Sequence, residues 1–411
     1  MMKEQQFRLI QHTFVSAKQN SRLYQDKFSQ IDDSFLQDEQ SSRKLTFTNK
    51  DDLRAIYPLG LQAVPEEKIV RIHSSSGTTG TPIIIPYTKQ DVDDWALLFR
   101  RCYELAGITS RDRIQITPGY GLWTAGIGFQ LGAELLGAMT IPTGPGNTDK
   151  QIQMMLDLKS TVLCATSSYA LLLAEEIARR GIGDRIYLTK GVIGSERWGK
   201  KMRERIKNEL SIDLFDIYGL TEIYGPGIGI SCKYDTGMHY FDDYVYFEII
   251  DPKTLEVLPD GEMGELVITT LRKEGAPLVR YRTHDLTRII PGECPCGSPY
   301  PRIDTIVGRT DDMVKVKGVN IFPGQIDELL SGIYGVSSEY MAVLEHKNGK
   351  DSMTLNFEVT GEGPSAEELE RYVVQRFKTK IGITISAHAV AIGELPRSMK
   401  KTKRIYDNRY E

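Results

Sequence analysis

The sequence has few cysteines, no long apolar run and almost no net charge. Five cysteines in 411 residues are too few for a disulfide framework, and no apolar run approaches the roughly 20 residues that span a bilayer. With 51 basic and 55 acidic residues, the net charge of -4 gives no strong field for binding nucleic acid or a membrane. The first residues lack the apolar core and the small-residue cleavage site of a secretory signal. We therefore expect a cytoplasmic enzyme whose partners are small molecules, with neither nucleic acid nor a membrane among them.

Length and apolar periodicity predict an α/β fold with two domains. A chain of 411 residues is too long for one ordinary core. Strands alternate with helices over residues 69–220, which indicates a sheet covered by helices, and residues 243–290 are mostly strand. The last hundred residues begin with a hairpin over 313–322 and predict a small α+β domain. We place the boundary so that residues 1–310 form a large N-terminal α/β domain and residues 311–411 a small C-terminal domain.

A hydroxyl-rich loop lies between two apolar stretches, Ile69–Ile72 and Ile83–Ile85. Its glycines let the backbone approach an anion closely, and its hydroxyls and backbone N–H groups can donate to phosphate oxygens. The Gly-Lys-[Ser/Thr] ending of a Walker A loop is missing. A flexible surface turn is the alternative, although a linker does not need apolar strands on both sides. The candidate phosphate-binding residues are Ser75, Ser76, Gly77, Thr78, Thr79 and Gly80.

Three further segments have residue types that suit a nucleotide site. The carboxylate of Glu222 beside the hydroxyl of Thr221 could hold Mg²⁺ and a phosphate oxygen. Asp285 offers a carboxylate to ribose hydroxyls, and Arg309 offers a second ribose contact next to a polar stretch. Taken singly, each of these segments is better explained by a surface salt bridge.

Together the motifs resemble those of the acyl-adenylate-forming (ANL) superfamily. SSSGTTGTP, YGLTE, YRTHD, GRTDDMVKVKGVNIFP and PRSMKKTKR occur in this order, and the match is closest to the phenylacetate–coenzyme A ligase family. LTFTNKDDLRAIYPLGLQAVP and GYGLWTAGIG extend the resemblance over nearly the whole chain. The resemblance implies the ANL adenylating-enzyme fold with a mobile C-terminal lid. It also implies a two-step reaction. The acid first attacks the α-phosphorus of ATP and releases diphosphate; the coenzyme A thiol then attacks the acyl-adenylate and releases AMP.

The resemblance also implies roles for single residues. Lys401 would bridge the substrate carboxylate and the α-phosphate, Thr221 would contact that phosphate, and Glu222 would orient Mg²⁺. Relatives usually carry glycine before the catalytic lysine, where this chain has Lys400, so Lys400 and Lys403 remain alternatives. The other residues implied to bind ATP or coenzyme A, besides the hydroxyl-rich loop, are Gly194, Ser195, Glu196, Asp216, Tyr218, Gly219, Asp285, Arg309, Lys317 and Gly318.

A stretch of aromatic and small residues suggests a pocket for the acid. Small residues leave room and rings supply walls, as apolar ligand pockets require. The candidates are Tyr120, Trp123 and Gly126 on one wall and Tyr224, Gly225 and Pro226 on the other. A plain buried helix with glycines at its contacts is the alternative. The walls suit an aryl acid, and phenylacetate, indoleacetate, hydroxyphenylacetate and benzoate-like acids all remain candidates.

Three cysteines and one histidine have the residue types of a zinc site. Cys232 and His239 lie seven residues apart, and Cys294 and Cys296 form a pair in a glycine-rich turn. Three thiolates and one imidazole make a tetrahedral site with no open position, which is typical of structural zinc. Some members of the resembled family carry such a cluster. Reduced surface thiols are the alternative.

The leading hypothesis is therefore an AMP-forming phenylacetate–coenzyme A ligase. Its implied cofactors are ATP, Mg²⁺, coenzyme A as a co-substrate and structural Zn²⁺. One alternative is an adenylyl transferase like the coenzyme F390 synthetases, and another is a nucleotide-binding sensor without catalysis. The sensor is disfavoured because Glu222, Asp285, Arg309 and Lys401 are all present. The oligomeric state is open, with a homodimer as one candidate.

Overall fold

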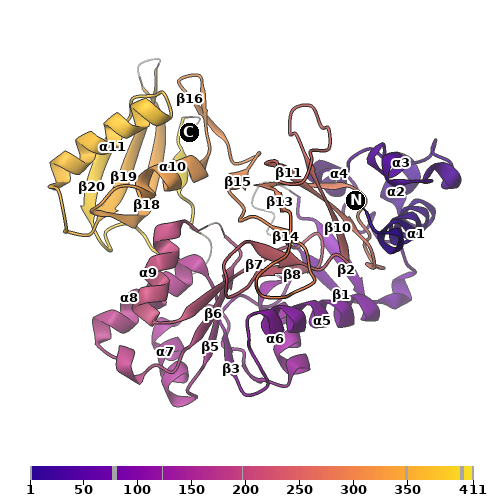
Figure 1. The fold of residues 1–411 in the computed structure, drawn as a ribbon, viewed down its shortest axis with the longest axis horizontal. Coiled ribbons are helices and arrows are strands. Elements are labelled where there is room, and N and C mark those ends of the chain that lie inside the picture. The colour runs from indigo at the N-terminus through magenta and orange to yellow at the C-terminus, as the bar shows by residue number, and fades with distance from the viewer. Residues whose placement is uncertain are drawn as a thin grey trace.

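The structure is a computed structural model that describes residues 2–75, 81–122, 124–196, 198–347, 350–398 and 402–409. Four α-helices come first, and strands and helices then alternate from residue 69 to 220, which confirms the α/β prediction (Figure 1). The elements before residue 310 are α1 (Glu4–Asn20), α2 (Arg22–Lys27), α3 (Glu39–Arg43), α4 (Lys50–Ala55), β1 (Ile69–Ser74), β2 (Ile84–Thr88), α5 (Lys89–Leu105), β3 (Arg113–Ile116), α6 (Ala125–Leu136), β4 (Met139–Ile141), α7 (Thr148–Asp157), β5 (Val162–Thr166), α8 (Ser167–Arg180), β6 (Lys190–Gly194), α9 (Lys200–Leu210), β7 (Asp213–Leu220), β8 (Gly225–Ser231), β9 (Met238–Tyr240), β10 (Val245–Ile250), β11 (Gly264–Thr270), β12 (Tyr281–Thr287), β13 (Ile289–Ile290), β14 (Arg302–Ile303) and β15 (Gly308–Arg309).

A nine-stranded sheet forms the centre of the large part, in the order β13-β14-β9-β8-β7-β6-β5-β3-β4. The strands from β4 to β7 run parallel to one another, and those from β7 to β13 pair antiparallel. Successive side chains of a strand point to opposite faces of its sheet. On β5, Val162 and Cys164 accordingly join the core beneath α5 and α6, whereas Leu163 and Ala165 join the core beneath α7, α8 and α9.

Local sequence signals explain where the covering helices begin and end. The Thr88 hydroxyl accepts a hydrogen bond from the backbone N–H of Asp91, and the Asp91 carboxylate accepts one from the backbone N–H of Thr88, so a capping box starts α5. Trp95, Phe99 and Cys102 then fall at three- or four-residue spacing and are fully buried. At the far end of α8, Gly181 adopts φ +63°, a left-handed conformation that favours glycine.

Two smaller sheets lie beside the central one. The strands β10, β11, β12 and β15 form an antiparallel sheet, and β1 and β2 form a hairpin (Figure 1). The register of β12 on β15 sets Asp285 opposite Arg309. This pairing joins two segments that the sequence separates by 24 residues.

The last hundred residues have a separate hydrophobic core. Its elements are β16 (Val314–Val316), β17 (Val319–Ile321), α10 (Pro323–Ser331), β18 (Val336–Lys347), β19 (Lys350–Val359), α11 (Ala366–Lys380), β20 (Ser386–Ala391) and β21 (Ile405–Asp407). The sheet has the order β20-β19-β18-β21, and buried side chains such as Phe357, Val373 and Phe377 fill the space between it and its helices. This is the predicted α+β composition, while the boundary between residues 310 and 311 remains a prediction.

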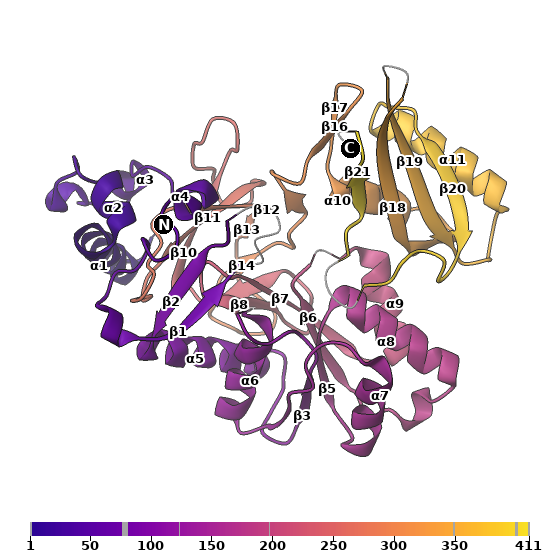
Figure 2. The same cartoon turned by 180° about the vertical axis from the view of Figure 1, so that it is seen from behind.

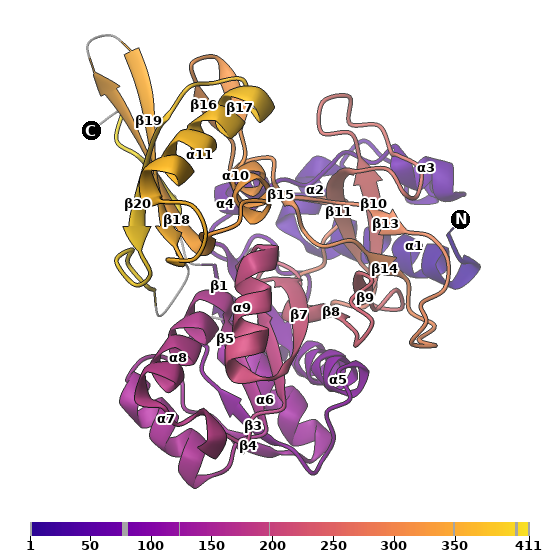
Figure 3. The same ribbon diagram turned by 60° about the vertical axis from the view of Figure 1, so that its left-hand side comes forward.

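The C-terminal part lies against α8 and α9 (Figures 2 and 3). The Nζ atom of Lys201 on α9 donates to the carbonyl oxygens of Ile333 and Val336 at 2.6 and 2.5 Å. Burial lowers the pKa of Lys201 below its ordinary value. Within the described ranges, none of the helices has both the length and the apolarity needed to cross a membrane.

Candidate active site

The carboxyl ends of the parallel strands bring several predicted residues to one edge of the central sheet. β6 ends at Gly194 and β7 ends at Leu220, directly before Thr221 and Glu222. Ligands of α/β sheets bind at this edge. Gly194 and Gly219 allow neighbouring backbone segments to lie close together here. A Cβ on Gly194 would overlap the carbonyl oxygen of Ile217, and one on Gly219 would overlap that of Gly225.

Three of the residues predicted to bind the nucleotide form one connected group. The Tyr218 hydroxyl donates to Asp285 at 2.6 Å, and the Arg309 guanidinium donates to the same carboxylate at 2.8 Å. Burial raises the pKa of Asp285 above its ordinary value, against the opposing charge of Arg309. Burial also raises the pKa of Tyr218, so its hydroxyl remains a donor. The group can therefore present an oriented carboxylate edge to a ligand, and its ribose role stays a prediction.

Thr221 and Glu222 connect this edge to two other segments. The Glu222 carboxylate is buried and lies 3.6 Å from the Lys50 ammonium at the start of α4. The Thr221 hydroxyl lies 3.4 Å from the Thr124 hydroxyl before α6. Sequence reasoning missed Lys50, although it lies in the LTFTNKDD stretch. That stretch supported the family resemblance but gave no role to any single residue.

The β1–β2 hairpin carries the predicted phosphate loop. The backbone N–H of Ser75 donates to the carbonyl oxygen of Ile83, and the N–H of Ile83 donates to the Ser75 hydroxyl, both at 3.0 Å. These bonds close the base of the loop. Ser76, Gly77, Thr78, Thr79 and Gly80 lie outside the described residues, and so do Trp123 and Lys401.

Two residues implied to bind the nucleotide contact neighbouring helices in this structure. The Asp216 carboxylate lies 3.8 Å from the Arg203 guanidinium of α9, and burial raises its pKa to about 6. Ser195 adopts φ +71°. This turn directs the chain to Glu196, whose two carboxylate oxygens accept from the backbone N–H groups of Ser168 at 2.7 Å and Thr402 at 2.9 Å. Glu196 therefore links α8 to the C-terminal part, a contact that the sequence did not predict.

The glycines of α6 serve close packing. A Cβ on Gly126 would lie 2.8 Å from the Tyr120 ring. A Cβ on Gly128 would overlap the Phe99 ring of α5, and one on Gly132 would overlap the Cβ atom of Phe99. The Tyr120 hydroxyl is buried and has no hydrogen-bond partner in the described part of the chain. These contacts are compatible with the buried-helix alternative, and the pocket role of Gly126 stays a prediction. Tyr120 remains the candidate pocket residue on this side.

The predicted second wall of the acid pocket, at Tyr224, contacts a buried lysine. Tyr224 is fully buried, and the Lys273 ammonium lies 4.3 Å from its ring centroid and 3.5 Å from that of Tyr87. Gly225 adopts φ +87°, and the Pro226 carbonyl accepts from the Trp95 indole at 2.9 Å. Burial lowers the pKa of Lys273 to about 8. A lysine in a charged LRKEG stretch gives no sequence signal of burial, so this contact between β2 and the segment after Glu222 was missed.

The predicted coenzyme A residues lie on a turn of the C-terminal part. Lys317 and Gly318 join β16 to β17 with φ +50° and +83°. The Lys317 ammonium donates to the carbonyl oxygen of Thr384 at 2.8 Å, and nothing lies within 4 Å of a Cβ on Gly318. The turn is exposed and lies away from the central sheet (Figures 1 and 3).

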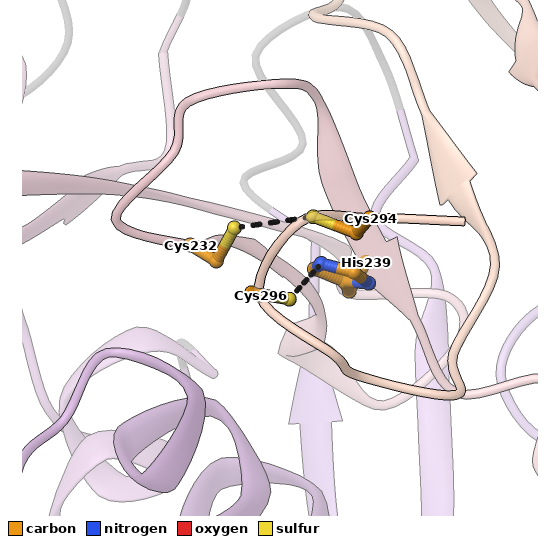
Figure 4. Close-up of side chains that lie close together, drawn as sticks. All are labelled: Cys232, His239, Cys294 and Cys296. Atoms are coloured by element: carbon orange, nitrogen blue, oxygen red, sulfur yellow. Dashed lines mark hydrogen bonds between the residues drawn. The ribbon is translucent and has the colours of Figure 1, made fainter. Parts of the chain in front are cut away.

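The predicted metal ligands lie together (Figure 4). The ligand atoms of Cys232, His239, Cys294 and Cys296 are all within 4.8 Å of one another. The Sγ atoms of Cys232 and Cys294 are 3.7 Å apart, and Sγ of Cys296 lies 3.3 Å from Nε2 of His239. The pairing of β9 with β14 brings the two halves of the cluster to one place, because it sets His239 opposite Arg302.

Polar contacts orient these groups as a metal site requires. Nδ1 of His239 lies 2.9 Å from the Tyr300 carbonyl oxygen. Because a carbonyl oxygen only accepts, Nδ1 carries the proton and donates it, and Nε2 is left as the nitrogen that can bind a metal. Burial opposes ionisation of Cys294, but hydrogen bonds from Thr236 and from Cys296 outweigh it and lower the pKa of this thiol to about 6. The group can therefore supply a thiolate at neutral pH.

Comparisons with known proteins show the family of the chain. The AMP-binding enzyme model matches residues 9–271, and the AMP-binding enzyme C-terminal domain model matches residues 318–409. The phenylacetate-coenzyme A ligase of Pseudomonas putida is 41% identical over 99% of this chain and 94% of its own. That of Escherichia coli K12 is 38% identical over 97% and 93%. The chain belongs to the phenylacetate–coenzyme A ligase family of AMP-binding enzymes.

Solved structures of 2-hydroxyisobutyryl-CoA ligase add the arrangement of the two parts. In the postadenylation state with R3-HIB-AMP, that protein matches with a TM-score of 0.88 at 25% identity, over 98% of this chain and 89% of its own. In the thioesterification state with 2-HIB-AMP and CoA, it matches with a TM-score of 0.71 at 26% identity and the same coverage. The present chain therefore superposes more closely on the postadenylation state of that ligase than on its thioesterification state.

Proposed function

We propose that this protein is an arylacetate–coenzyme A ligase, with phenylacetate as its acid. The reaction converts the acid, ATP and coenzyme A into arylacetyl-coenzyme A, AMP and diphosphate through an acyl-adenylate. The observation that carries the proposal is the connected group of Tyr218, Asp285 and Arg309 beside Glu222. It lies at the carboxyl edge of the sheet, in a chain with four named phenylacetate-coenzyme A ligases among its relatives.

The first half-reaction joins two anions, so it needs cations and oriented donors at the forming bond. A carboxylate oxygen of the acid attacks the α-phosphorus, and the bond to the leaving diphosphate breaks. Thr221 would contact the α-phosphate and Lys401 would bridge it to the acid. The buried carboxylate of Glu222, next to the hydroxyl of Thr221 in the sequence, suits Mg²⁺. The ion would offset the charge of the ATP oxygens.

The second half-reaction needs a different face of the C-terminal part. The coenzyme A thiol attacks the carbonyl carbon of the acyl-adenylate, and AMP leaves with the electron pair of the broken C–O bond. Gly318 would leave room for the pantetheine arm, and Lys317 is next to it. Because this turn lies away from the central sheet in the present arrangement, we propose that the C-terminal part rotates between the half-reactions.

Zinc is the metal that we propose for the Cys/His cluster. In a tetrahedral site with Zn–S of about 2.3 Å and Zn–N of about 2.05 Å, two sulfur atoms lie about 3.8 Å apart and sulfur and nitrogen about 3.6 Å apart. The observed separations of 3.7 Å and 3.3 Å are close to these edges. Four protein ligands support a structural role.

A panel of carboxylic acids tests the proposed reaction. We expect AMP to form only when an arylacetate, ATP, Mg²⁺ and coenzyme A are all present, with phenylacetate far better than acetate. Diphosphate release without AMP would instead indicate an adenylyl transferase, and equal activity with acetate would refute the aryl-acid pocket. The homodimer remains a prediction, which light scattering on the purified protein tests.

A further inference from the structure

A network of charged side chains joins the C-terminal part to α8 and α9. The Arg397 guanidinium donates to Glu175 of α8 at 2.7 and 3.0 Å and also to Glu358 of β19 at 2.8 Å. Glu175 accepts a further bond from Arg205 of α9 at 2.7 Å. We call these four residues, Glu175, Arg205, Glu358 and Arg397, the α8 latch. Its central bond, from Arg397 to Glu175, is the one that crosses between the two parts.

Each charge of the α8 latch has a second partner within its own part. Arg397 keeps Glu358, which is fully buried and also accepts from the backbone N–H groups of Gly393 and Leu395. Glu175 keeps Arg205. Breaking a buried ion pair is costly when it leaves one charge buried without a partner. Breaking the central bond does not have this effect, because Arg397 and Glu175 each keep a partner.

Glu196 also has one partner in the C-terminal part and a second partner in the large part. The Glu196 carboxylate accepts from Thr402 of the C-terminal part, and it also accepts from Ser168 at the start of α8. If Thr402 moves away, Glu196 keeps the bond from Ser168. Arg397 and Thr402 flank the proposed catalytic Lys401 in the sequence, so the two contacts hold the lysine-bearing segment from both sides.

We propose that Glu175 is a positioning residue for the first half-reaction, and that Arg205 is its partner once the C-terminal part has turned away. The inference rests on the proposed function and names how the adenylation arrangement is held and released. Glu175 bonds Arg397 only while the C-terminal part lies against α8, so it favours that arrangement. Arg205 compensates Glu175 in both arrangements, so it lowers the cost of release. Although burial opposes it, the two guanidinium groups hold the pKa of Glu175 below its ordinary value.

The two residues predict opposite effects on the half-reactions. Glu175→Gln removes a charge from the bond that holds the adenylation arrangement. Because hydrogen bonds to an ionised acceptor are about twice as strong as neutral ones, we expect acid-dependent diphosphate release to fall about tenfold. Thioester formation from supplied aryl-adenylate should stay unchanged or rise. Arg205→Gln leaves Glu175 with Arg397 as its main partner, so it should preserve diphosphate release and slow thioester formation several-fold.

The neighbouring Glu176 provides a matched control. It bonds Arg179 and Arg180 within its own helix, so Glu176→Gln makes the same chemical change without touching the α8 latch. We expect wild-type rates from it in both half-reactions. Small-angle X-ray scattering of the whole protein gives a readout besides activity, and Glu175→Gln should give a more extended average shape than Glu176→Gln.

The outcomes separate this inference from the proposed function. A wild-type protein that forms no AMP with any aryl acid refutes the ligase. An active wild type in which Glu175→Gln slows both half-reactions equally, or matches Glu176→Gln, overturns the latch alone. The latch is also wrong if Arg205→Gln slows diphosphate release as Glu175→Gln does. Should Glu175→Gln fail to fold, Glu175→Asp, which keeps the charge and shortens its reach, should still slow the first half-reaction selectively.

Discussion

Removal of one cluster ligand gives the most direct test of the metal site. Cys294→Ser replaces a thiolate that hydrogen bonds already favour, with its pKa at about 6, by a hydroxyl that zinc binds poorly. Zinc at this site would cross-link Cys232 to Cys294 and so close a loop of 62 residues. By the chain-entropy relation for cross-links, closing such a loop restricts the unfolded chain by about 4 kcal/mol. Metal binding to the unfolded cysteines offsets part of this, so we expect the free energy of unfolding to fall by about 2–4 kcal/mol.

That free energy translates into a measurable change of melting temperature. A cooperative unit of about 300 residues has an unfolding entropy of about 0.6 kcal/mol per degree, so a loss of 3 kcal/mol lowers Tm by about 5 °C. Mass spectrometry of metals in the purified protein should find one zinc per chain in the wild type and less in Cys294→Ser. A strong chelator should lower the Tm of the wild type and leave that of Cys294→Ser almost unchanged. AMP formation at a temperature well below Tm should change far less.

A buried cysteine outside the cluster controls for the loss of a thiol. Cys164→Ala on β5 removes a fully buried side chain and should lower Tm through the cavity that it leaves. It should retain zinc and keep its response to chelator. A wild-type protein with no zinc, or one whose Tm ignores the chelator, would show that the cluster is a set of reduced thiols.

Four further changes test other parts of the molecule. Lys401→Ala should cut diphosphate release about 10²–10³-fold and spare thioester formation from supplied aryl-adenylate, because one positioned charge is lost. Gly318→Leu should do the reverse in the same two assays, since its side chain would block the thiol's path. Burial lowers the pKa of His73 to about 4, so the unfolded chain takes up the proton first and the folded state loses about 2 kcal/mol between pH 6.5 and 5. His73→Phe should remove this loss in urea unfolding at the two pH values. Gly128→Ala would press a methyl group into the Trp95 and Phe99 rings and should cost about 1–3 kcal/mol of stability.

Local patterns of the sequence explain part of the structure. The alternating faces of Val162–Ala165 follow from the two-residue period of a strand, and the cap at Thr88 follows from a hydroxyl three residues before a carboxylate. The residue types of the Cys/His cluster predicted a shared site, and the structure places the four ligand atoms together, while the zinc itself stays a prediction. Tyr218, Asp285 and Arg309 were chosen by motif, and strand register then brings them into contact.

Contacts between segments that are far apart in the sequence could not be predicted from local patterns. Lys50 contacts Glu222 only because α4 lies near the edge of the sheet. Lys273 is buried because the rings of Tyr87 and Tyr224, which are far apart in the sequence, both pack against it. The glycines of α6 show the same limit. A run of small residues near aromatic ones fits a ligand pocket and a close helix contact equally well, and only the position of α5 shows that Gly128 and Gly132 make the contact.

Two chemical steps at one site place conflicting demands on the C-terminal part. The first step needs a cation fixed between two anions, which favours tight contacts on both sides of Lys401. The second step needs those contacts to break, because the turn at Gly318 lies away from the sheet edge in the present arrangement. A contact that left a buried charge unpaired would hold the first arrangement too strongly, since such losses cost about 3–5 kcal/mol. Glu175 and Glu196 avoid this cost because Arg205 and Ser168 remain bound to them. On the proposed function, this shared bonding lets one surface be held firmly and still be released in every cycle.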